Sequence, residues 1–428
     1  MTTEALFPHQ LQAAEFLAAR RCALLADEPR VGKTPATVRA CDIVGAKRIL
    51  VLCPAIARLD WARKFAQFGG TPRHVECVFS AGDTIHAAPE VLVSSYALAE
   101  SLQHLTQIGA LDVLILDEAH YLKSVTAKRT KVVLGTNGLV HKARRVWFLT
   151  GTPAPNNVAE LWPMLYVSGR YAKNYAAFTR DFCTGYHTQW GYQITGTKNA
   201  EALRELMSGF ILRRPLESVY AEMPELNYSH FSVQASEPVS VESAAVYKSL
   251  SMVDVGAQDA PRLAVHAQAL STWRREVGLK KAPLAVERVK YLRLPKLVLF
   301  AVHRDVIESL QNQLRAYNPA VLHGSVTADA REKELFRFRD DGTCRVMIAQ
   351  IQTAGTAVDM SAADHALIVE ASFTPGDNEQ AANRLRNILK RRPCFVEFFS
   401  IAGGLDEKIH RILNRKSAGL CELWPDLS

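Results

Sequence analysis

Residues 22–34 read CALLADEPRVGKT, and this stretch decides the fold class. The apolar run Cys22–Ala26 leads through a short loop into an amphipathic segment, Thr34–Val44. An uninterrupted apolar run is typical of a strand buried on both faces of a parallel sheet. A Gly-Lys-Thr sequence before a helix favours phosphate binding, because the free N–H groups and the dipole at a helix start attract anions. The stretch therefore predicts a strand, a phosphate loop and a helix in succession.

Each residue type in this loop has a defined chemical use. Gly32 lets the backbone approach a phosphate closely, Lys33 would reach the β- and γ-phosphates, and the Thr34 hydroxyl would ligate Mg²⁺. The pattern departs from the full GxxxxGK[ST] form because Asp27 stands where the first glycine is expected. A lone Gly-Lys-Thr also arises by chance, so this element needs support from elsewhere in the chain. The predicted nucleotide-binding loop comprises Asp27, Glu28, Arg30, Val31, Gly32, Lys33 and Thr34.

Two further elements follow apolar runs. Asp-Glu-Ala-His (117–120) comes directly after Leu111–Leu116, and Thr-Gly-Thr-Pro (150–153) ends the run that begins at Val146. Ligands of open α/β sheets bind at the carboxyl ends of the strands. Asp117 is expected to hold Mg²⁺ through water, and Glu118 to orient and deprotonate an attacking water. The sequence thus predicts ATP and Mg²⁺ at one edge of a sheet.

Apolar runs alternate with amphipathic segments in two separate parts of the chain, which predicts an α/β fold with two parallel-sheet lobes. Helical periodicity dominates between them. The predicted divisions are an N-terminal lobe at 1–155, helical insertions with a linker at 156–285, and a C-terminal lobe at 286–428. Strands are expected at Cys22–Ala26, Arg48–Cys53, Val91–Ser94, Val113–Leu116, Val146–Thr150, Leu297–Val302, Ala320–Leu322, Val346–Ala349, Ala366–Glu370 and Phe395–Phe399, and helices at Thr34–Val44, Arg58–Phe68, Asp305–Ala316, Ala328–Arg339 and Asp377–Lys390.

Composition narrows the class of protein. The 428 residues are 48% hydrophobic and carry a net charge of +8, from 51 basic and 43 acidic side chains. This balance favours a polyanionic partner such as nucleic acid. The apolar runs are far shorter than the roughly 20 residues that cross a bilayer, and no secretory signal is expected. The eight scattered cysteines favour neither a disulfide framework nor a zinc site and suit a reducing compartment.

In this order, the motifs resemble those of superfamily 2 helicases, specifically the Swi/Snf-type translocases of double-stranded DNA. The stretch LTGTPAPNNVAELWPML (149–165) is similar to the GTPxxN and ELW pattern of that family, and FILRRP (210–215) to its double-arginine segment. QIQTAGTAVDM (350–360) resembles the fifth helicase motif, and Gln380–Arg384 the sixth. The resemblance covers nearly the whole chain and is strongest with short phage-encoded and annealing-helicase-like members.

The resemblance implies two RecA-like lobes with helical insertions, and one ATP bound between the lobes. Gln10 would read the adenine edge, and Gln380 and Arg384 would join Lys33, Asp117 and Glu118 in catalysis. The implied partner is double-stranded or branched DNA, bound largely without sequence preference. A monomer without a membrane partner is expected, and the compactness of the chain suggests the cytoplasm of a bacterial or phage-infected cell. The implied DNA contacts are Pro54, Ser94, Ser95, Tyr96, Asn156, Gly324, Gln350 and Gly355.

The sequence departs from the family pattern at three positions. Arg30 stands where the family usually has glycine; it could contact phosphate or face solvent, and we favour solvent. The fifth motif keeps only Gly355 of its usual glycines, which weakens the expected DNA contact. Asn387 stands where the family has a second arginine, the arginine finger, which is worth about 10³–10⁵ in rate.

The predicted helix at 377–390 would place Arg384 and Asn387 on one face and Arg386 nearly opposite. Arg386 or Arg391 could replace the missing arginine if that helix bends or ends early. Two alternatives to a double-strand motor stay open. One is a helicase acting on RNA or single strands, and the other is a nucleotide-gated DNA-binding protein with weak or no hydrolysis.

Overall fold

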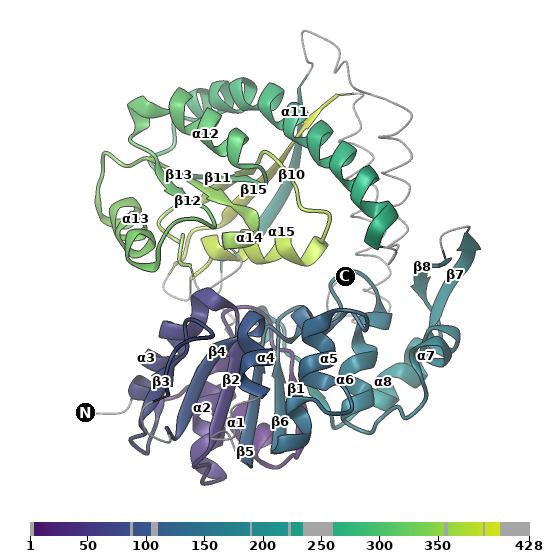
Figure 1. Cartoon of the computed structure of the whole chain (residues 1–428). Helices are drawn as coiled ribbons and strands as arrows, with labels where there is room; N and C mark the ends of the chain where they lie inside the picture. Colours follow the sequence, from purple (N-terminus) through teal and green to yellow (C-terminus); the bar gives the residue numbers. More distant parts are fainter. Residues whose placement is uncertain are drawn as a thin grey trace. The chain divides into compact units, whose positions relative to one another are not determined.

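A computed structural model describes residues 4–85, 89–103, 110–188, 191–220, 224–233, 260–354, 358–387 and 390–402 (Figure 1). The chain divides into two compact units. The first contains Met1–Cys183 and Thr197–Ala221, and the second contains Thr184–Gly196 and Glu222–Cys421. Each unit is built around its own parallel sheet.

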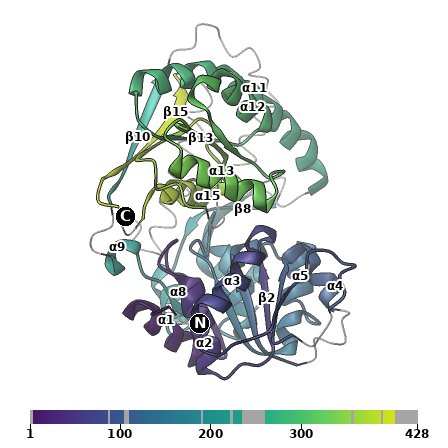
Figure 2. The same ribbon diagram turned by 90° about the vertical axis from the view of Figure 1, so that its left-hand side faces the viewer.

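The first unit is an α/β domain whose described strands form one parallel sheet in the order β3-β4-β2-β5-β6-β1-β9. Helices cover both faces of this sheet (Figures 1 and 2). The strands are β1 (Cys22–Leu25), β2 (Ile49–Cys53), β3 (Val75–Cys77), β4 (Val91–Ser95), β5 (Leu111–Asp117), β6 (Ala143–Leu149) and β9 (Ile211–Leu212). The helices are α1 (Pro8–Ala18), α2 (Lys33–Ile43), α3 (Arg58–Phe68), α4 (Ala99–Gln103), α5 (Lys128–Leu134), α6 (Trp162–Val167), α7 (Tyr175–Phe182), α8 (Ala200–Met207) and α9 (Leu216–Val219).

Burial on both faces explains why these strands read as continuous apolar runs. Ile49, Val51 and Cys53 of β2 pack in a core shared with helices α1, α2 and α3. Leu50 and Leu52 alternate with them and are also fully buried. Successive side chains of a strand point to opposite faces, so β2 contributes to a core on each side of the sheet.

The second unit repeats this architecture. Its described parallel strands follow the order β10-β15-β14-β11-β13-β12, and β7 and β8 form a separate two-stranded ribbon. The strands are β7 (Cys183–Thr188), β8 (Gly191–Thr197), β10 (Leu226–Val233), β11 (Leu297–Ala301), β12 (Ala320–Leu322), β13 (Val346–Gln350), β14 (His365–Ile368) and β15 (Cys394–Ile401). The helices are α11 (Ala260–Leu292), α12 (Arg304–Gln313), α13 (Ala328–Asp340), α14 (Ile351–Ala354) and α15 (Pro375–Ala382).

Strand β11 divides the second unit into two cores. Leu297 and Leu299 pack with residues of α11 and α12, whereas Val298 and Phe300 pack with residues of α13 and α15. The α/β class and the two parallel-sheet lobes expected from the sequence are therefore confirmed.

The part of the chain expected to hold helical insertions also contains strands. β9 extends the first sheet beside β1, and β10 pairs along its whole length with β15 of the second sheet. Most residues of β10 are exposed, and several are polar, so the strand does not form the apolar run by which buried strands are predicted. The divisions at residues 155 and 285 stay a prediction.

The prediction of a helix over 377–390 is wrong beyond Ala382. α15 ends there, a short 3-10 turn covers Asn383–Leu385, and Arg386 is extended at φ −88° and ψ 143°. The Arg384 carbonyl accepts from the Met360 N–H (3.0 Å). In a continuing α-helix it would instead accept from the N–H four residues further along the chain. Asn387 donates to Asp359 at 3.0 Å, which holds this segment against a neighbouring loop.

Within the described residues, no helix is both long enough and apolar enough to cross a membrane.

Candidate nucleotide-binding site

The phosphate loop joins β1 to α2 and depends on two left-handed residues. Gly32 precedes α2 at φ 98°, and Arg30 adopts φ 73°. A Cβ on Gly32 would lie 2.1 Å from Gln10 Nε2, so the close packing of Gln10 on the loop also requires glycine here. Gln10 is held in turn by the Phe7 N–H, which donates to its Oε1 at 3.1 Å. The structure therefore brings Gln10 to the loop, while its contact with adenine stays a prediction.

Lys33 folds back over the loop. Its ammonium donates to the backbone oxygens of Asp27 (2.7 Å) and Glu28 (3.1 Å). The carboxylates of Asp27 and Glu28 are buried and pair with Arg214 and Arg213. The loop thus presents backbone groups and the lysine ammonium, while its acidic side chains lie inside the protein.

Asp117 ends β5, next to β6 and therefore close to β1 in the sheet. Parallel strands end at the same edge, so Asp117, Thr150 and the phosphate loop lie along one edge of the first unit. The Trp61 indole N–H donates to Asp117 Oδ2 (2.8 Å), and the Glu118 N–H donates to Oδ1 (3.0 Å). Burial and the neighbouring Glu118 charge raise the Asp117 pKa to about 7, although the Trp61 hydrogen bond and the Lys33 charge oppose them.

Glu118 sits in a left-handed conformation at φ 48° and belongs to a small polar network. The Thr150 hydroxyl donates to Glu118 Oε2 at 3.4 Å, and His120 Nδ1 lies 3.3 Å from the same oxygen. The Thr152 N–H donates to Thr150 Oγ1 at 3.1 Å. The Asp-Glu-Ala-His and Thr-Gly-Thr-Pro segments are therefore joined through Thr150.

The residues at this edge fit a magnesium–nucleotide complex. Thr34 offers a hydroxyl in the first turn of α2, and Asp117 offers a carboxylate. Hydroxyl and carboxylate oxygens are the ligands Mg²⁺ prefers. Gly151 allows close packing with the loop, because a Cβ there would lie 2.8 Å from Pro29 Cδ.

The DNA-contact candidates of the first unit are buried or bonded within the protein. Pro54, Ser94, Ser95 and Tyr96 are buried, and the Tyr96 hydroxyl donates to the Asp117 backbone oxygen at 2.7 Å. Asn156 is half-buried and bonds Glu160 through both its backbone (2.9 Å) and its side chain (2.7 Å). A DNA contact at these positions stays a prediction.

In the second unit, two candidates far apart in sequence meet. The Gly324 N–H donates to Gln350 Oε1 at 3.0 Å, and Gln350 Nε2 donates to the Val302 oxygen at 3.1 Å. Gln380 is buried in α15, and Arg384 follows in the 3-10 turn. Gly355 lies outside the described residues.

Comparison with known families decides the classification. Residues 9–261 match the model of the SNF2-related domain, and residues 284–388 match that of the helicase conserved C-terminal domain. The chain belongs to the SNF2-related family. The resemblance to Swi/Snf-type members of helicase superfamily 2 is thereby confirmed.

Curated relatives of this SNF2-related chain are longer proteins. The DNA annealing helicase and endonuclease ZRANB3 of Mus musculus is 28% identical and aligns with 96% of this chain but 40% of its own length. The SWI/SNF-related matrix-associated actin-dependent regulator of chromatin subfamily A-like protein 1 of Drosophila melanogaster is 23% identical over 98% of this chain and 56% of its own length. The chain thus spans about half the length of these relatives. The solved Sulfolobus solfataricus SWI2/SNF2 ATPase core in complex with dsDNA is 18% identical, with a TM-score of 0.47, over 99% of this chain and 94% of that chain.

Sequence reasoning missed two features of the SNF2-related site. Trp61 has no assigned role in the sequence analysis; at 1% exposure it is a packing residue, and its indole N–H also donates to Asp117. Arg213 and Arg214 belong to a recognisable double-arginine segment without an expected role, and they bind the acidic residues of the phosphate loop. In both cases the residues stand out in the sequence, and only the fold reveals their partners.

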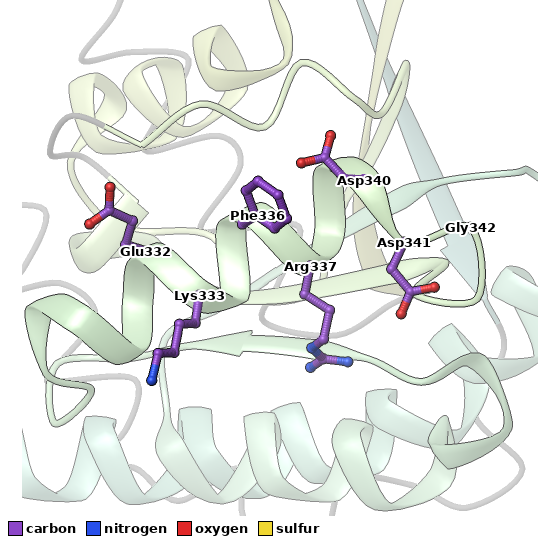
Figure 3. Close-up of a pocket in the computed structure, with 7 residues that line it drawn as sticks. All are labelled: Glu332, Lys333, Phe336, Arg337, Asp340, Asp341 and Gly342. Carbon is purple, nitrogen blue, oxygen red and sulfur yellow. The ribbon is translucent and has the colours of Figure 1, made fainter.

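A hollow of about 820 Å³ lies along α13, and no candidate site residue lines it (Figure 3). Its lining residues are Glu332, Lys333, Phe336, Arg337, Asp340, Asp341 and Gly342.

Proposed function

We propose that this SNF2-related chain is a DNA-dependent ATPase that couples ATP hydrolysis to movement along duplex or branched DNA. The observation that carries the proposal is the meeting of Lys33, Asp117 and Thr150 at one edge of the first sheet. Such an edge is where open α/β sheets bind their ligands. Membership of the SNF2-related family supports DNA as the partner.

The residues of the first unit divide the chemistry among them. Lys33 and the N–H groups at the start of α2 bind the phosphates, and Thr34 and Asp117 would hold Mg²⁺. Bound Mg²⁺ would neutralise charge that develops on the phosphate oxygens. Glu118 takes a proton from the attacking water, and the Thr150 hydroxyl fixes the carboxylate that does so.

The second unit contributes Gln380 and Arg384 in this proposal. Asn387 cannot supply the positive charge of an arginine finger, so hydrolysis is expected to be slow unless another arginine replaces it. Arg386 is 4% exposed, whereas Arg391 is exposed, so Arg391 is the better candidate. If neither arginine substitutes, the alternative is a nucleotide-gated DNA-binding protein with weak or no ATP hydrolysis.

DNA binding is proposed to be sequence-independent and sensitive to salt, as phosphate contacts are. Among the proposed contacts that the structure describes, Asn156, Gly324 and Gln350 are at least partly exposed, whereas those at or just after the ends of β2 and β4 are buried. The proposal has three further parts: annealing or remodelling of branched DNA, a monomeric state, and a bacterial or phage setting.

A pair of displacement assays tests whether the motor moves along double-stranded DNA or along a single strand. A double-strand translocase should displace the third strand of a triplex in the presence of ATP and should do little on a simple forked duplex. The control is the Glu118→Gln variant, which should bind ATP but displace nothing. Rapid separation of the forked duplex without triplex displacement would instead favour a single-strand helicase.

A further inference from the structure

A segment distant in sequence runs beside the phosphate loop. The Ala26 N–H donates to the Leu212 oxygen at 2.7 Å, and the Glu28 N–H donates to the Arg214 oxygen at 3.2 Å. These bonds continue the pairing of β1 with β9 into the loop itself. The loop is therefore flanked along its acidic part by the Arg213–Arg214 segment.

Arg214 binds the first acidic residue of the loop as a two-pronged fork. Its Nε donates to Asp27 Oδ1 at 3.0 Å, and its Nη2 donates to Asp27 Oδ2. Its Nη1 also donates to the His9 oxygen, 2.9 Å away, just before Gln10. Asp27 is 1% exposed, and a charge so deeply buried needs a partner in good geometry.

Arg213 joins the second acidic residue to the end of β6. Its Nη2 lies 3.5 Å from Glu28 Oε1, and its Nη1 donates to the oxygens of Ala26 (3.3 Å) and Gly151 (3.4 Å). Glu28 Oε2 accepts from the Leu216 N–H at 2.9 Å. The phosphate loop, the Thr-Gly-Thr-Pro segment and α9 thus meet at Arg213 and Glu28.

The same two acidic residues also hold the catalytic lysine. Lys33 donates to the backbone oxygens of Asp27 and Glu28, while their side chains are held by the two arginines. A shift of either carboxylate would move the carbonyl that contacts Lys33.

We propose that Arg213 and Arg214 are positioning residues that hold the phosphate loop and Lys33 in the conformation that binds the nucleotide phosphates. The inference rests on the proposed ATPase function. Neither arginine needs to touch the nucleotide, because each acts through Asp27 or Glu28. Loss of this support misplaces the loop, and small misplacements of binding groups are costly.

The test is nucleotide affinity in a variant that removes the charges of the pair together. Asp27→Asn combined with Arg214→Gln removes both charges of the pair together and leaves neither partner as an unpaired buried charge, which guards against simple unfolding. A fluorescent ATP analogue should bind about 10-fold more weakly to this variant, equivalent to a change of about 1.4 kcal/mol. In ATP hydrolysis, the KM should rise by a similar factor. Arg214→Lys with Asp27 intact should recover part of the affinity, because it restores the charge but not the fork.

Arg170→Gln is the matched control. Arg170 donates to the Ser208 oxygen at 2.9 Å, just before β9, and does not touch the loop. Its loss should leave affinity unchanged. If the paired variant does not fold, Arg213→Lys supplies the same test, because it removes the contacts with Ala26 and Gly151 but keeps a positive charge beside Glu28.

The two levels of the proposal fail differently. Wild-type protein that neither binds the analogue nor hydrolyses ATP would overturn the proposed function. Wild-type protein that binds and hydrolyses ATP, with a folded Asp27→Asn/Arg214→Gln or Arg213→Lys variant of equal affinity, would overturn the positioning role alone.

Discussion

The Asp117 carboxylate is difficult to ionise where it lies, and its neighbours determine its orientation. Burial raises its pKa to about 7, against the lowering effect of the Trp61 hydrogen bond. Trp61 donates to Oδ2 and the Glu118 N–H to Oδ1, so both oxygens have a fixed direction. Asp117 is the proposed Mg²⁺ ligand, and groups that orient a metal ligand commonly affect its affinity for the metal.

Trp61→Phe tests this arrangement, because it keeps a buried ring and removes the indole N–H. The Mg²⁺ concentration for half-maximal binding of a fluorescent ATP analogue should rise by about 10-fold. Trp147→Phe is the control, since Trp147 is equally buried in the same unit and donates to the Arg20 oxygen (3.3 Å), away from Asp117. Equal Mg²⁺ requirements in the two variants would contradict the role given to Trp61.

Arg30 carries a backbone conformation that suits glycine. At φ 73° a side chain costs about 1 kcal/mol, so Arg30→Gly should raise the free energy of unfolding by about that amount. If Arg30 faces solvent, the KM for ATP should stay unchanged; an increase would indicate a phosphate contact. Arg293→Gly is the control, because Arg293 also has a positive φ of 49° and lies in the second unit. Urea denaturation and ATP hydrolysis together give both results.

Among the elements, those with continuous apolar sequences could be predicted and those shaped by distant contacts could not. β2 and β11 lie within a residue of their expected bounds because burial on both faces imposes an apolar run. β10 is largely exposed, so its hydrogen bonds to β15 leave no apolar signature. α15 ends early because the Arg384 oxygen bonds Met360, a contact that local helix propensity cannot anticipate.

The long helix α11 is attached to the second sheet by a partly buried ion pair. Arg288 donates to Glu397 of β15 through two nitrogens, at 3.0 and 2.8 Å, and His365 Nε2 lies 3.0 Å from Glu397 Oε1. Burial alone would raise the Glu397 pKa, but the hydrogen bonds and charges of Arg288 and His365 lower it below its usual value of 4.5. Ionised Glu397 therefore stabilises the fold above about pH 4.5, and this stabilisation is lost as pH falls through the lower folded pKa.

Glu397→Gln should reduce the free energy of unfolding by about 2–3 kcal/mol at pH 7 and by less in acid. Urea denaturation at several pH values measures the difference from wild type. Glu308→Gln provides the control, because the Arg304–Glu308 pair is more than half exposed on both sides and should contribute little. A difference between Glu397→Gln and wild type that does not shrink in acid would contradict the assigned pKa direction.

At the scale of the whole molecule, the order of the motifs along the chain predicted the family reliably. No single motif was sufficient evidence for it. The Gly-Lys-Thr loop alone is ambiguous. The Asp-Glu-Ala-His and Thr-Gly-Thr-Pro segments that follow it predicted a shared site, and the first sheet places all three along one edge. The matches to the SNF2-related domain and the helicase C-terminal domain account for both units. Asn387 is the position at which this chain departs most from the expected chemistry.

The rate of ATP hydrolysis with and without duplex DNA tests the central claim most directly. Wild-type protein should hydrolyse ATP faster when duplex DNA is added, single-stranded DNA should stimulate it less, and Glu118→Gln should abolish turnover while binding of a fluorescent ATP analogue persists. A wild-type rate that stays at background with duplex DNA would contradict a motor and favour nucleotide-gated DNA binding.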